Sequence, residues 1–528
     1  MNLAEFLTHT ADRIPDHPAI LFEGRSVSFA EMNQRVDALA HGLKRGGLRT
    51  GDVCVLMMPS SLDWALAYYA LAKLGAVVVP VNFLYRRGEL EHIFKDSGAR
   101  AFIGHEDYLE EPLKVMDALP RMDMRISAGN DAPGGFVSLA DLPVDEDGPF
   151  PIVPTDPDDP FAVIYTSGTT GLPKGAVLAH KGLMSDVVEV SRVRHTEPDD
   201  IVLSVLPLFH IYGQTHSLNI SIYLGLTIHM WTGFDAETVM KAIEEEKSTI
   251  LYAVPTMVNR LVELAADSPP ARSGLRFVIS GGASLPVEVL YRFEKAFNAT
   301  IYESYGLTEF SPTCVENPFG RPTRPGSIGV PIPPFKVRVV DEDDTDVPVG
   351  DVGELIVSGS AVMKEYLNQP EATARALRGG WLHTGDLARM DEDGYIYIVD
   401  RKKDMIIRGG YNIYPREIEE VLYTHSGISE AAVMGIPHAD LGEEIAAVIV
   451  LKPGVDVTED QLRQYVRDRV APYKYPRVIR FMDELPKTAA GNCRRRPRGK
   501  FSSEGSPWKN RSERNSTETF ELGPLRET

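Results

Sequence analysis

A loop rich in glycine and hydroxyl side chains, YTSGTTGLPKG at residues 165–175, is the strongest chemical signal in the sequence. Small residues let backbone N–H groups approach phosphate oxygens, hydroxyl groups add donors, and Lys174 adds a positive charge. The order differs from the GxxxxGK(S/T) pattern, because Pro173 precedes the lysine and Gly175 follows it. The segment therefore predicts a phosphate-binding loop of another kind.

Four further segments carry side chains suited to binding a nucleotide or an acid. They are residues 206–213 (LPLFHIYG), 280–286 (SGGASLP), 302–309 (YESYGLTE) and 381–386 (WLHTGD). Each has an ordinary structural explanation when taken alone. His210 could be a buried structural histidine, Glu309 a solvated loop carboxylate, and the other two segments turns.

Taken in order, these segments resemble the motifs of the adenylate-forming superfamily, which includes acyl-CoA synthetases, luciferases and the adenylation domains of peptide synthetases. A longer match covers residues 394–419. The resemblance implies an AMP-forming acyl-CoA synthetase (fatty-acid–CoA ligase) that uses ATP, Mg²⁺ and coenzyme A. In such an enzyme the carboxylate attacks the α-phosphorus of ATP, pyrophosphate leaves, and the CoA thiolate then displaces AMP.

The resemblance also implies roles for individual residues. His210 would lie beside the carboxylate, Thr308 near the α-phosphate, and Glu309 would bind Mg²⁺, for which carboxylate oxygen is a suitable ligand. Asp386 would accept hydrogen bonds from the ribose hydroxyls, and Arg401 would approach the ribose. The full set expected to bind ATP or AMP is Thr166, Ser167, Gly168, Thr169, Thr170, Gly171, Lys174, Gly281, Gly282, Ala283, Tyr305, Gly306, Thr308, Asp386 and Arg401.

The family uses one active site for both half-reactions, because its small domain rotates about a hinge after adenylation. The resemblance places Lys403 at this hinge. It places Gly409, Gly410 and Tyr411 along the channel for the CoA pantetheine. A basic surface turn is the ordinary alternative for the hinge segment.

The sequence departs from the family near residue 492. The family motif Pro-Lys-Thr-x-x-Gly-Lys ends in a lysine that contacts the carboxylate and the α-phosphate, whereas residues 486–491 (PKTAAG) are followed by Asn492. Asparagine is neutral and shorter, so it cannot supply that cation in the transition state. We therefore expect impaired adenylation at this catalytic position, with the thioester half-reaction retained.

The segment after Asn492 is also atypical. Residues 493–528 lack apolar periodicity and are expected to be disordered. They hold nine Lys or Arg and five Glu, a balance of +4 against −20 for the whole chain. A frameshift in the last codons would explain the loss of lysine, periodicity and charge character together.

The elements that must position these residues alternate between apolar strands and amphipathic helices, which predicts an α/β fold. We expect a large N-terminal domain of α/β subdomains with a small β-rich unit, and a smaller, mobile α+β C-terminal domain. The bounds are 1–400, which would bind ATP and the acyl substrate, then 401–492, then the tail 493–528. Residues 64–81 should divide into a helix ending at Leu74 and a Val-rich strand, and should not span a membrane.

Bulk composition narrows the class of protein. A net charge of −20 argues against nucleic-acid binding. Cys54, Cys314 and Cys493 are too far apart to suggest a disulfide framework or a zinc site. Glu5 and Asp12 do not fit a signal peptide. We expect a soluble cytoplasmic protein whose partners are a small carboxylic acid and CoA, and a homodimer is an open alternative.

Residues 210–225 (HIYGQTHSLNISIYLG) bear on the class of substrate. They contain no carboxylate that could bind an amino group, which favours an acid without one. The apolar side chains there suit an acyl chain or belong to the core. They are Ile211, Tyr212, Leu218, Ile220 and Ile222. A medium- or long-chain fatty acid is the first expectation, and an aromatic acid of the coumarate type the second. The rival classes are a carrier-loading adenylation enzyme and a catalytically weakened nucleotide-binding homologue.

Overall fold

The computed structural model describes residues 1–116, 119, 122–129, 131–142, 148–166, 173–245, 247–270, 272–438 and 440–487. The chain divides into two compact units, Met1–Ile398 and a second unit that begins at Val399. Each unit has its own hydrophobic core. Asp400, the last residue of the first predicted domain, lies within the second unit.

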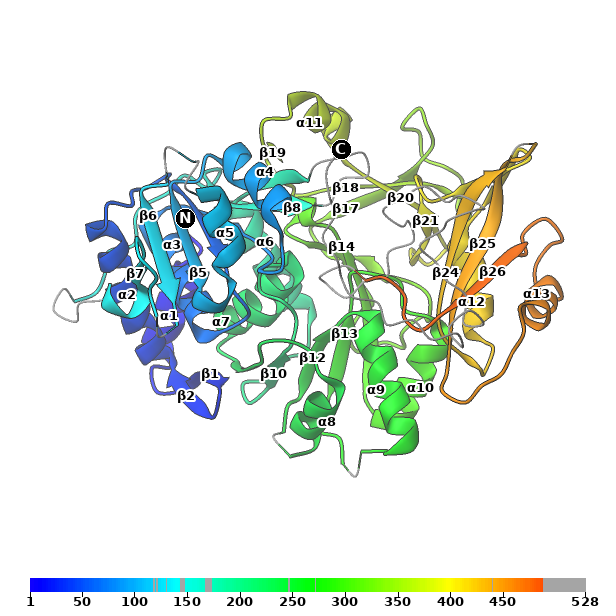
Figure 1. Ribbon diagram of the computed structural model, residues 1–528, viewed down its shortest axis with the longest axis horizontal. Helices are drawn as coiled ribbons and strands as arrows, with labels where there is room; N and C mark the ends of the chain where they lie inside the picture. Colours follow the sequence, from blue (N-terminus) through cyan, green and yellow to red (C-terminus); the bar gives the residue numbers. More distant parts are fainter. Residues whose placement is uncertain are drawn as a thin grey trace, which may run out of the picture. The chain divides into compact units, whose positions relative to one another are not determined.

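One sheet of the first unit has the strand order β19-β9-β8-β4-β3-β5-β6-β7 among the described residues (Figure 1). Neighbours from β8 through β7 are parallel, whereas β9 is antiparallel to β8 and β19 to β9. Helices α2 and α3 bury one face, and α4 and α5 bury the other. The bounds are β3 Val53–Met57, β4 Val77–Pro80, β5 Ala101–His105, β6 Met124–Ala128, β7 Val137–Ser138, β8 Pro160–Thr166, β9 Lys174–Ala179, β19 Glu365–Tyr366, α2 Phe29–Arg45, α3 Leu62–Leu74, α4 Arg87–Ser97 and α5 Glu110–Met116.

The apolar stretch 64–81 divides as predicted. Ser61 caps α3 by accepting a hydrogen bond from the N–H of Trp64, and Gly75, with φ of 69°, ends it. The chain then enters the fully buried strand β4. Within the described residues, no helix combines the length and the apolar character that a membrane crossing requires.

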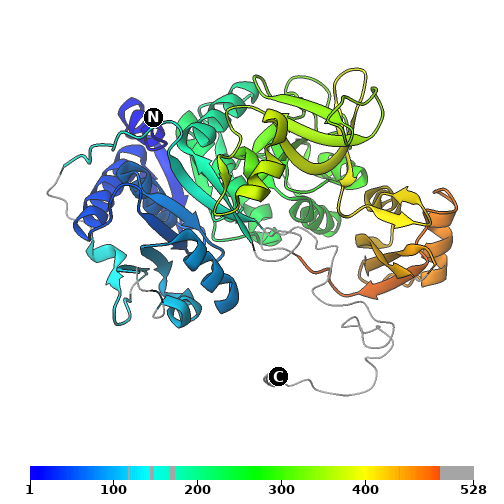
Figure 2. The same ribbon diagram turned by 90° about the horizontal axis from the view of Figure 1, so that it is seen from above.

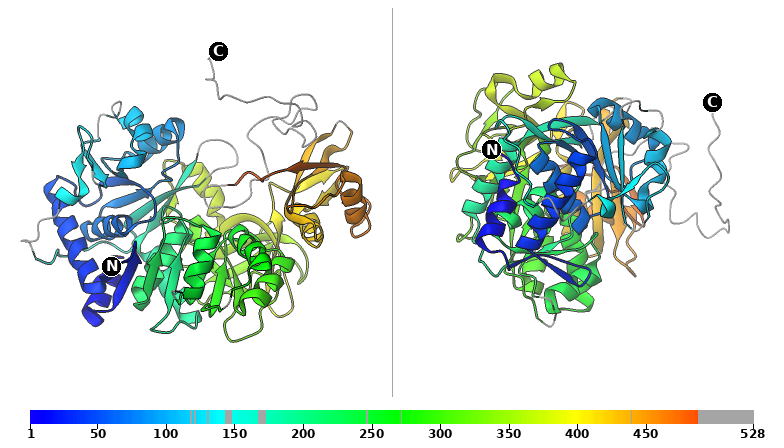
Figure 3. Two further views of the ribbon diagram at one scale, coloured as in Figure 1. Left: turned by 60° about the horizontal axis from the view of Figure 1, so that its bottom comes forward. Right: turned by 90° about the vertical axis from the view of Figure 1, so that its left-hand side faces the viewer.

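A second sheet has the order β16-β15-β14-β13-β12-β10-β11-β1-β2. Strands β14 through β1 are parallel to one another, whereas β15 is antiparallel to β14 and β2 to β1. Helices α8, α9 and α10 lie beside β12 and β13 (Figure 1). Figure 3 shows the dark blue N-terminal elements next to the strands of residues 201–230. The bounds are β1 Pro18–Phe22, β2 Arg25–Ser28, β10 Ile201–Ser204, β11 Thr227–Met230, β12 Ile250–Ala253, β13 Phe277–Ser280, β14 Thr300–Gly306, β15 Thr313–Glu316, β16 Val330–Pro331, α1 Glu5–Arg13, α6 His180–Val193, α7 Ile220–Leu224, α8 Ala236–Glu245, α9 Pro255–Asp267 and α10 Val287–Phe297.

A four-stranded antiparallel sheet, β17-β18-β20-β21, follows in the chain and matches the predicted β-rich unit. The bounds are β17 Lys336–Val340, β18 Gly353–Ser358, β20 Leu382–Met390 and β21 Ile396–Arg401, with helix α11 at Pro370–Ala376. Buried side chains of this sheet, such as Leu355 and Val357, belong to the main core of the first unit.

The second unit is a sheet of order β23-β22-β25-β24, with β26 paired to β25. Helices α12 and α13 pack on one face of it (Figure 2). The bounds are β22 Ile406–Arg408, β23 Tyr411–Ile413, β24 Ile428–His438, β25 Gly442–Leu451, β26 Val478–Met482, α12 Pro415–Tyr423 and α13 Glu459–Arg467. The predicted fold class, a large α/β part with a β-rich unit and a smaller α+β part, is confirmed.

Candidate active site

Three of the predicted binding segments lie at the carboxyl ends of parallel strands in the second sheet. His210 follows β10, Gly281 follows β13, and Gly306 ends β14. Ligands of α/β proteins commonly bind just outside these strand ends. The topology therefore gathers segments that are far apart in the sequence at one edge of the sheet.

The glycine pair after β13 combines a buried residue, Gly281, with an exposed backbone surface at Gly282. A Cβ atom at Gly281 would lie 3.2 Å from the Tyr212 ring and 3.3 Å from the carbonyl oxygen of Ser304. Gly282 has φ of 80°, which L side chains rarely adopt. The Tyr212 hydroxyl donates to the carbonyl of Ile279 at 2.9 Å and so fixes the ring there. This surface, with Ala283 exposed next to it, is compatible with the predicted adenine site.

Tyr305 and Asp386 come from two different motifs and are joined directly. The Tyr305 hydroxyl donates to Oδ2 of Asp386 at 2.6 Å, and Asp386 is 9% exposed. Burial, followed by the negative charge of Asp386, raises the pKa of Tyr305 well above its ordinary value. The hydroxyl therefore remains a donor, and it orients the carboxylate predicted to bind the ribose.

Gly306 is required by a close backbone approach. A Cβ atom there would lie 2.1 Å from the carbonyl oxygen of Pro312, which accepts a 2.9 Å hydrogen bond from the N–H of Leu307. This approach closes the turn that carries Thr308 and Glu309, which lie in a short 3₁₀ helix, Thr308–Phe310. Any other residue at position 306 must displace this turn.

The contacts of the Glu309 side chain suit a carboxylate that binds magnesium. The Tyr366 hydroxyl donates to Oε1 at 2.8 Å, and no hydrogen bond or ion pair to Oε2 is present among the residues that the structure describes. In that same part of the chain, no group of three or more His, Cys, Asp or Glu side chains could hold a metal. Mg²⁺ is commonly bound by one or two carboxylates together with substrate phosphates, so a single open carboxylate suits it.

Lys174 lies close to Glu309 through Tyr366. Its Nζ atom is 5.1 Å from the centre of the Tyr366 ring, a cation–π geometry. Thr166 and Lys174 face each other where β8 and β9 pair, so the two ends of the predicted phosphate loop are held together. Ser167, Gly168, Thr169, Thr170 and Gly171 lie outside the described residues.

His210 is partly exposed, and its surroundings lower its pKa to about 4 by desolvation. The imidazole is therefore neutral at neutral pH. Its Nδ1 atom lies 3.2 Å from the N–H of Tyr212 and accepts from it, which assigns the proton to Nε2. His210 thus offers one neutral N–H donor, as a residue that orients a carboxylate requires.

A buried polar network lies beneath the site, and no sequence motif indicated it. Arg194 donates from Nε and Nη2 to Glu316 at 3.0 and 2.5 Å, with both side chains fully or nearly fully buried. Asp186 accepts a 2.7 Å hydrogen bond from the N–H of Thr313. Burial raises the pKa of Asp186 well above its ordinary value. The network ties α6 to β15, the strand that follows the Thr308–Glu309 turn.

The predicted acyl segment forms a π-helix, η4 (Gly213–Asn219), that continues into α7. Its apolar side chains Ile211, Leu218, Ile220 and Ile222 are buried in the core. Several polar side-chain atoms there are buried without a hydrogen-bond partner among the described residues. They are both amide atoms of Gln214, Nδ1 of His216, and the hydroxyls of Ser217 and Ser221. The segment is therefore more polar than an alkyl chain requires.

The residues predicted for the hinge and the CoA channel lie in the second unit. Arg401 and Lys403 are exposed, and Gly409 and Gly410 have φ of 57° and 84°. The exposed Tyr411 ring stacks on Tyr473, with ring centres 4.7 Å apart. Asn492 lies outside the described residues. Their predicted roles stay predictions.

Comparisons with known proteins identify the family of the chain. The family model for AMP-binding enzymes matches residues 7–367, and the model for the AMP-binding enzyme C-terminal domain matches residues 417–492. A long-chain-fatty-acid–CoA ligase of Bacillus subtilis (strain 168) is 36% identical over 523 residues, covering 94% of this chain and 93% of the relative. A feruloyl-CoA synthase of an Amycolatopsis species is 36% identical over 478 residues, covering 90% of this chain and 94% of the relative.

Solved structures show the same fold. The anthranilate CoA ligase AuaEII in complex with anthranoyl-AMP superimposes with a TM-score of 0.88 at 28% identity, covering 93% of this chain and 95% of that one. These relatives differ in the acid that their names give. The comparisons therefore agree on the reaction type and leave the acid open.

Proposed function

The chain belongs to the AMP-binding enzyme family, and from this premise we propose which acid it activates and which residues act. The coarse activity is that of an ATP-dependent acid–CoA ligase of the AMP-forming type. The observation that carries the proposal is the 2.6 Å hydrogen bond that joins Tyr305, in β14, to Asp386, in β20.

In the first half-reaction the acid's carboxylate would accept a hydrogen bond from Nε2 of His210. Asp386, oriented by Tyr305, would bind the ribose hydroxyls, and Lys174 would approach the phosphates with its positive charge. Mg²⁺ held at Glu309 would supply neutralisation of phosphate charge. In the second half-reaction CoA would enter along Gly409 and Gly410, after a rotation at Lys403.

A medium- or long-chain fatty acid is the proposed substrate, supported by the similarity to long-chain-fatty-acid–CoA ligases. A hydroxylated aromatic acid is a second candidate. It is favoured by the buried polar atoms of Gln214, His216 and Ser217, which lack partners among the described residues and would suit a substrate hydroxyl. A panel of fatty, cinnamic and benzoic acids, assayed for AMP release with ATP and CoA, separates the two candidates.

Adenylation is proposed to be slowed by Asn492, which stands where a cation would contact the developing charge. We expect thioester formation from synthetic acyl-AMP and CoA to exceed ATP–pyrophosphate exchange. Asn492→Lys should raise that exchange at least about tenfold, because one preorganised charged group commonly contributes several kcal/mol. An exchange rate that is already fast and is unchanged by the substitution would refute this proposal.

Two rival functions predict other outcomes in the same assays. A carrier-loading enzyme would prefer a carrier protein to CoA when both compete for the acyl group. A nucleotide-binding homologue would bind ATP and release no AMP with any acid.

A further inference from the structure

Tyr366 contacts both Glu309, which is predicted to bind Mg²⁺, and Lys174, which is predicted to bind the phosphates of ATP. Its hydroxyl donates to Oε1 of Glu309 at 2.8 Å, and Nζ of Lys174 lies 5.1 Å from its ring centre. We propose that Tyr366 is a positioning residue that aims both the Glu309 carboxylate and the Lys174 ammonium at Mg²⁺-bound ATP. This inference rests on the proposed function and adds to it a residue that no sequence motif indicated.

The backbone around Tyr366 joins both charged residues to one short segment. The N–H of Met363 donates to the carbonyl of Glu309 at 2.7 Å, and the N–H of Leu367 donates to the carbonyl of Gly175 at 2.8 Å. Between them, Tyr366 pairs with Ala176 where β19 meets β9. Residues 363–367 therefore bridge the Glu309 turn and the strand that begins with Lys174.

The direction of the hydrogen bond between Tyr366 and Glu309 suits a carboxylate that binds a metal. The Tyr366 hydroxyl is the donor in this hydrogen bond, because a carboxylate oxygen such as Oε1 of Glu309 accepts. A donor on Oε1 fixes the rotation of the carboxylate and leaves Oε2 to face a cation. Hydrogen-bonded partners of this kind orient metal-binding carboxylates in many proteins.

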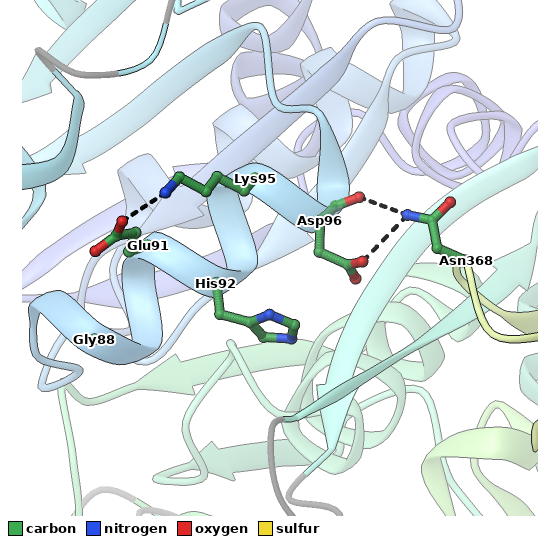
Figure 4. Close-up of a pocket in the computed structure, with 6 residues that line it drawn as sticks. All are labelled: Gly88, Glu91, His92, Lys95, Asp96 and Asn368. Carbon is green, nitrogen blue, oxygen red and sulfur yellow. Dashed lines mark hydrogen bonds and ion pairs between the residues drawn. The ribbon is translucent and has the colours of Figure 1, made fainter.

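A second set of hydrogen bonds joins the residues next to Tyr366 to helix α4. Asn368, with φ of 54°, donates from Nδ2 to the carbonyl oxygen and Oδ1 of Asp96 at 2.9 and 3.2 Å (Figure 4). The other carboxylate oxygen of Asp96 accepts from the Tyr165 hydroxyl at 2.8 Å. His92, on the same helix α4, is hydrogen-bonded to the carbonyl of Pro173 at 2.9 Å. Helix α4 therefore braces Tyr366 and both flanks of the predicted phosphate loop.

Tyr366→Phe tests the proposal because it removes the hydroxyl and keeps the ring below Lys174. ATP binding is measured by calorimetry with Mg²⁺ and with EDTA, on the full chain without an acid substrate. We define the Mg²⁺ factor as the ratio of the dissociation constant of ATP in EDTA to that in Mg²⁺. We expect this factor to fall about tenfold in the variant. Tyr366→Leu should also weaken ATP binding in EDTA, since Lys174 loses the ring that supports it.

Tyr397→Phe is the matched control, because its hydroxyl also donates to a carboxylate, Asp391 at 3.2 Å. It should bind ATP like the wild type. In a Glu309→Gln background, Tyr366→Phe should have no further effect on the Mg²⁺ factor, because the two residues act as one unit. Additive effects of the two substitutions, or a Tyr366→Phe variant with an unchanged factor, would overturn the inference.

The calorimetric assay also separates this inference from the proposed function. A wild-type chain that binds Mg²⁺-ATP and activates no acid would refute the function alone, while the Mg²⁺ factor still decides the role of Tyr366. A wild-type chain whose ATP affinity does not respond to Mg²⁺ would overturn the inference, whatever acid it activates.

Discussion

The buried pair of Arg194 and Glu316 gives the sharpest prediction about stability. Glu316→Gln preserves the shape of the side chain and removes its charge, while Arg194 stays fully buried. Two short charge-assisted hydrogen bonds are weakened at once. Removing one partner of a buried pair leaves an uncompensated charge, so we expect a loss of about 3–5 kcal/mol in the free energy of unfolding. That is a large fraction of the roughly 5–15 kcal/mol that stabilises a typical domain.

The measurement is thermal and urea-induced unfolding of the full chain, compared at the first transition. Glu197→Gln is the control, because Glu197 pairs with Arg276 at 2.8 Å and is 68% exposed. The Glu197→Gln variant should lose less than about 1 kcal/mol in the free energy of unfolding. Asp186 is a nearby carboxylate that could ionise and compensate, so Asp186→Asn is added to Glu316→Gln. If even this double variant unfolds like the Glu197→Gln control, the reasoning about the buried pair is wrong.

Two other predictions concern Gly306 in the site and His180, the first residue of α6. Gly306→Ala should abolish Mg²⁺-ATP binding in calorimetry, because its Cβ would meet the Pro312 carbonyl at 2.1 Å. Gly350→Ala is the control, because Gly350 has a positive φ and its Cβ would meet open space. This control variant should bind Mg²⁺-ATP normally. Burial lowers the pKa of His180 to about 4, below its unfolded value, so its contribution to stability is complete above about pH 6.5 and is lost as the pH falls toward 4. His180→Gln should therefore flatten the decline in stability between pH 6.5 and 4 by up to about 3 kcal/mol in urea titrations, and an equal decline in both proteins would contradict this.

The strand and helix pattern was predictable because it depends on local periodicity. The apolar stretch after Trp64 divided at Leu74 as expected, and short apolar runs alternate with amphipathic helices along the first unit. The positions of the glycines also carried information. Gly281 and Gly306 are needed for close backbone approaches, and the motifs that contain them were identified without knowledge of those approaches.

The contacts that join the motifs were not predictable from one sequence. Tyr366 lies in a two-residue strand, too short to leave a periodic pattern, and its partners Glu309 and Lys174 are distant in the chain. The Arg194–Glu316 pair likewise depends on the meeting of α6 and β15. The π-helix at residues 213–219 has no signature in the order of apolar and polar side chains along the segment.

Strand β1 has a consequence for the order in which the protein folds during synthesis. Ile20 pairs with Ile228, so β1 completes its sheet only with a strand made more than 200 residues later. At about 5–20 residues per second, the edge of the β1–β2 hairpin that will meet β11 stays without its partner for roughly 10–40 s. An unpaired strand edge invites association with other chains. The nascent protein is therefore most exposed to aggregation before β11 leaves the ribosome, and chaperone binding in that interval should govern its yield.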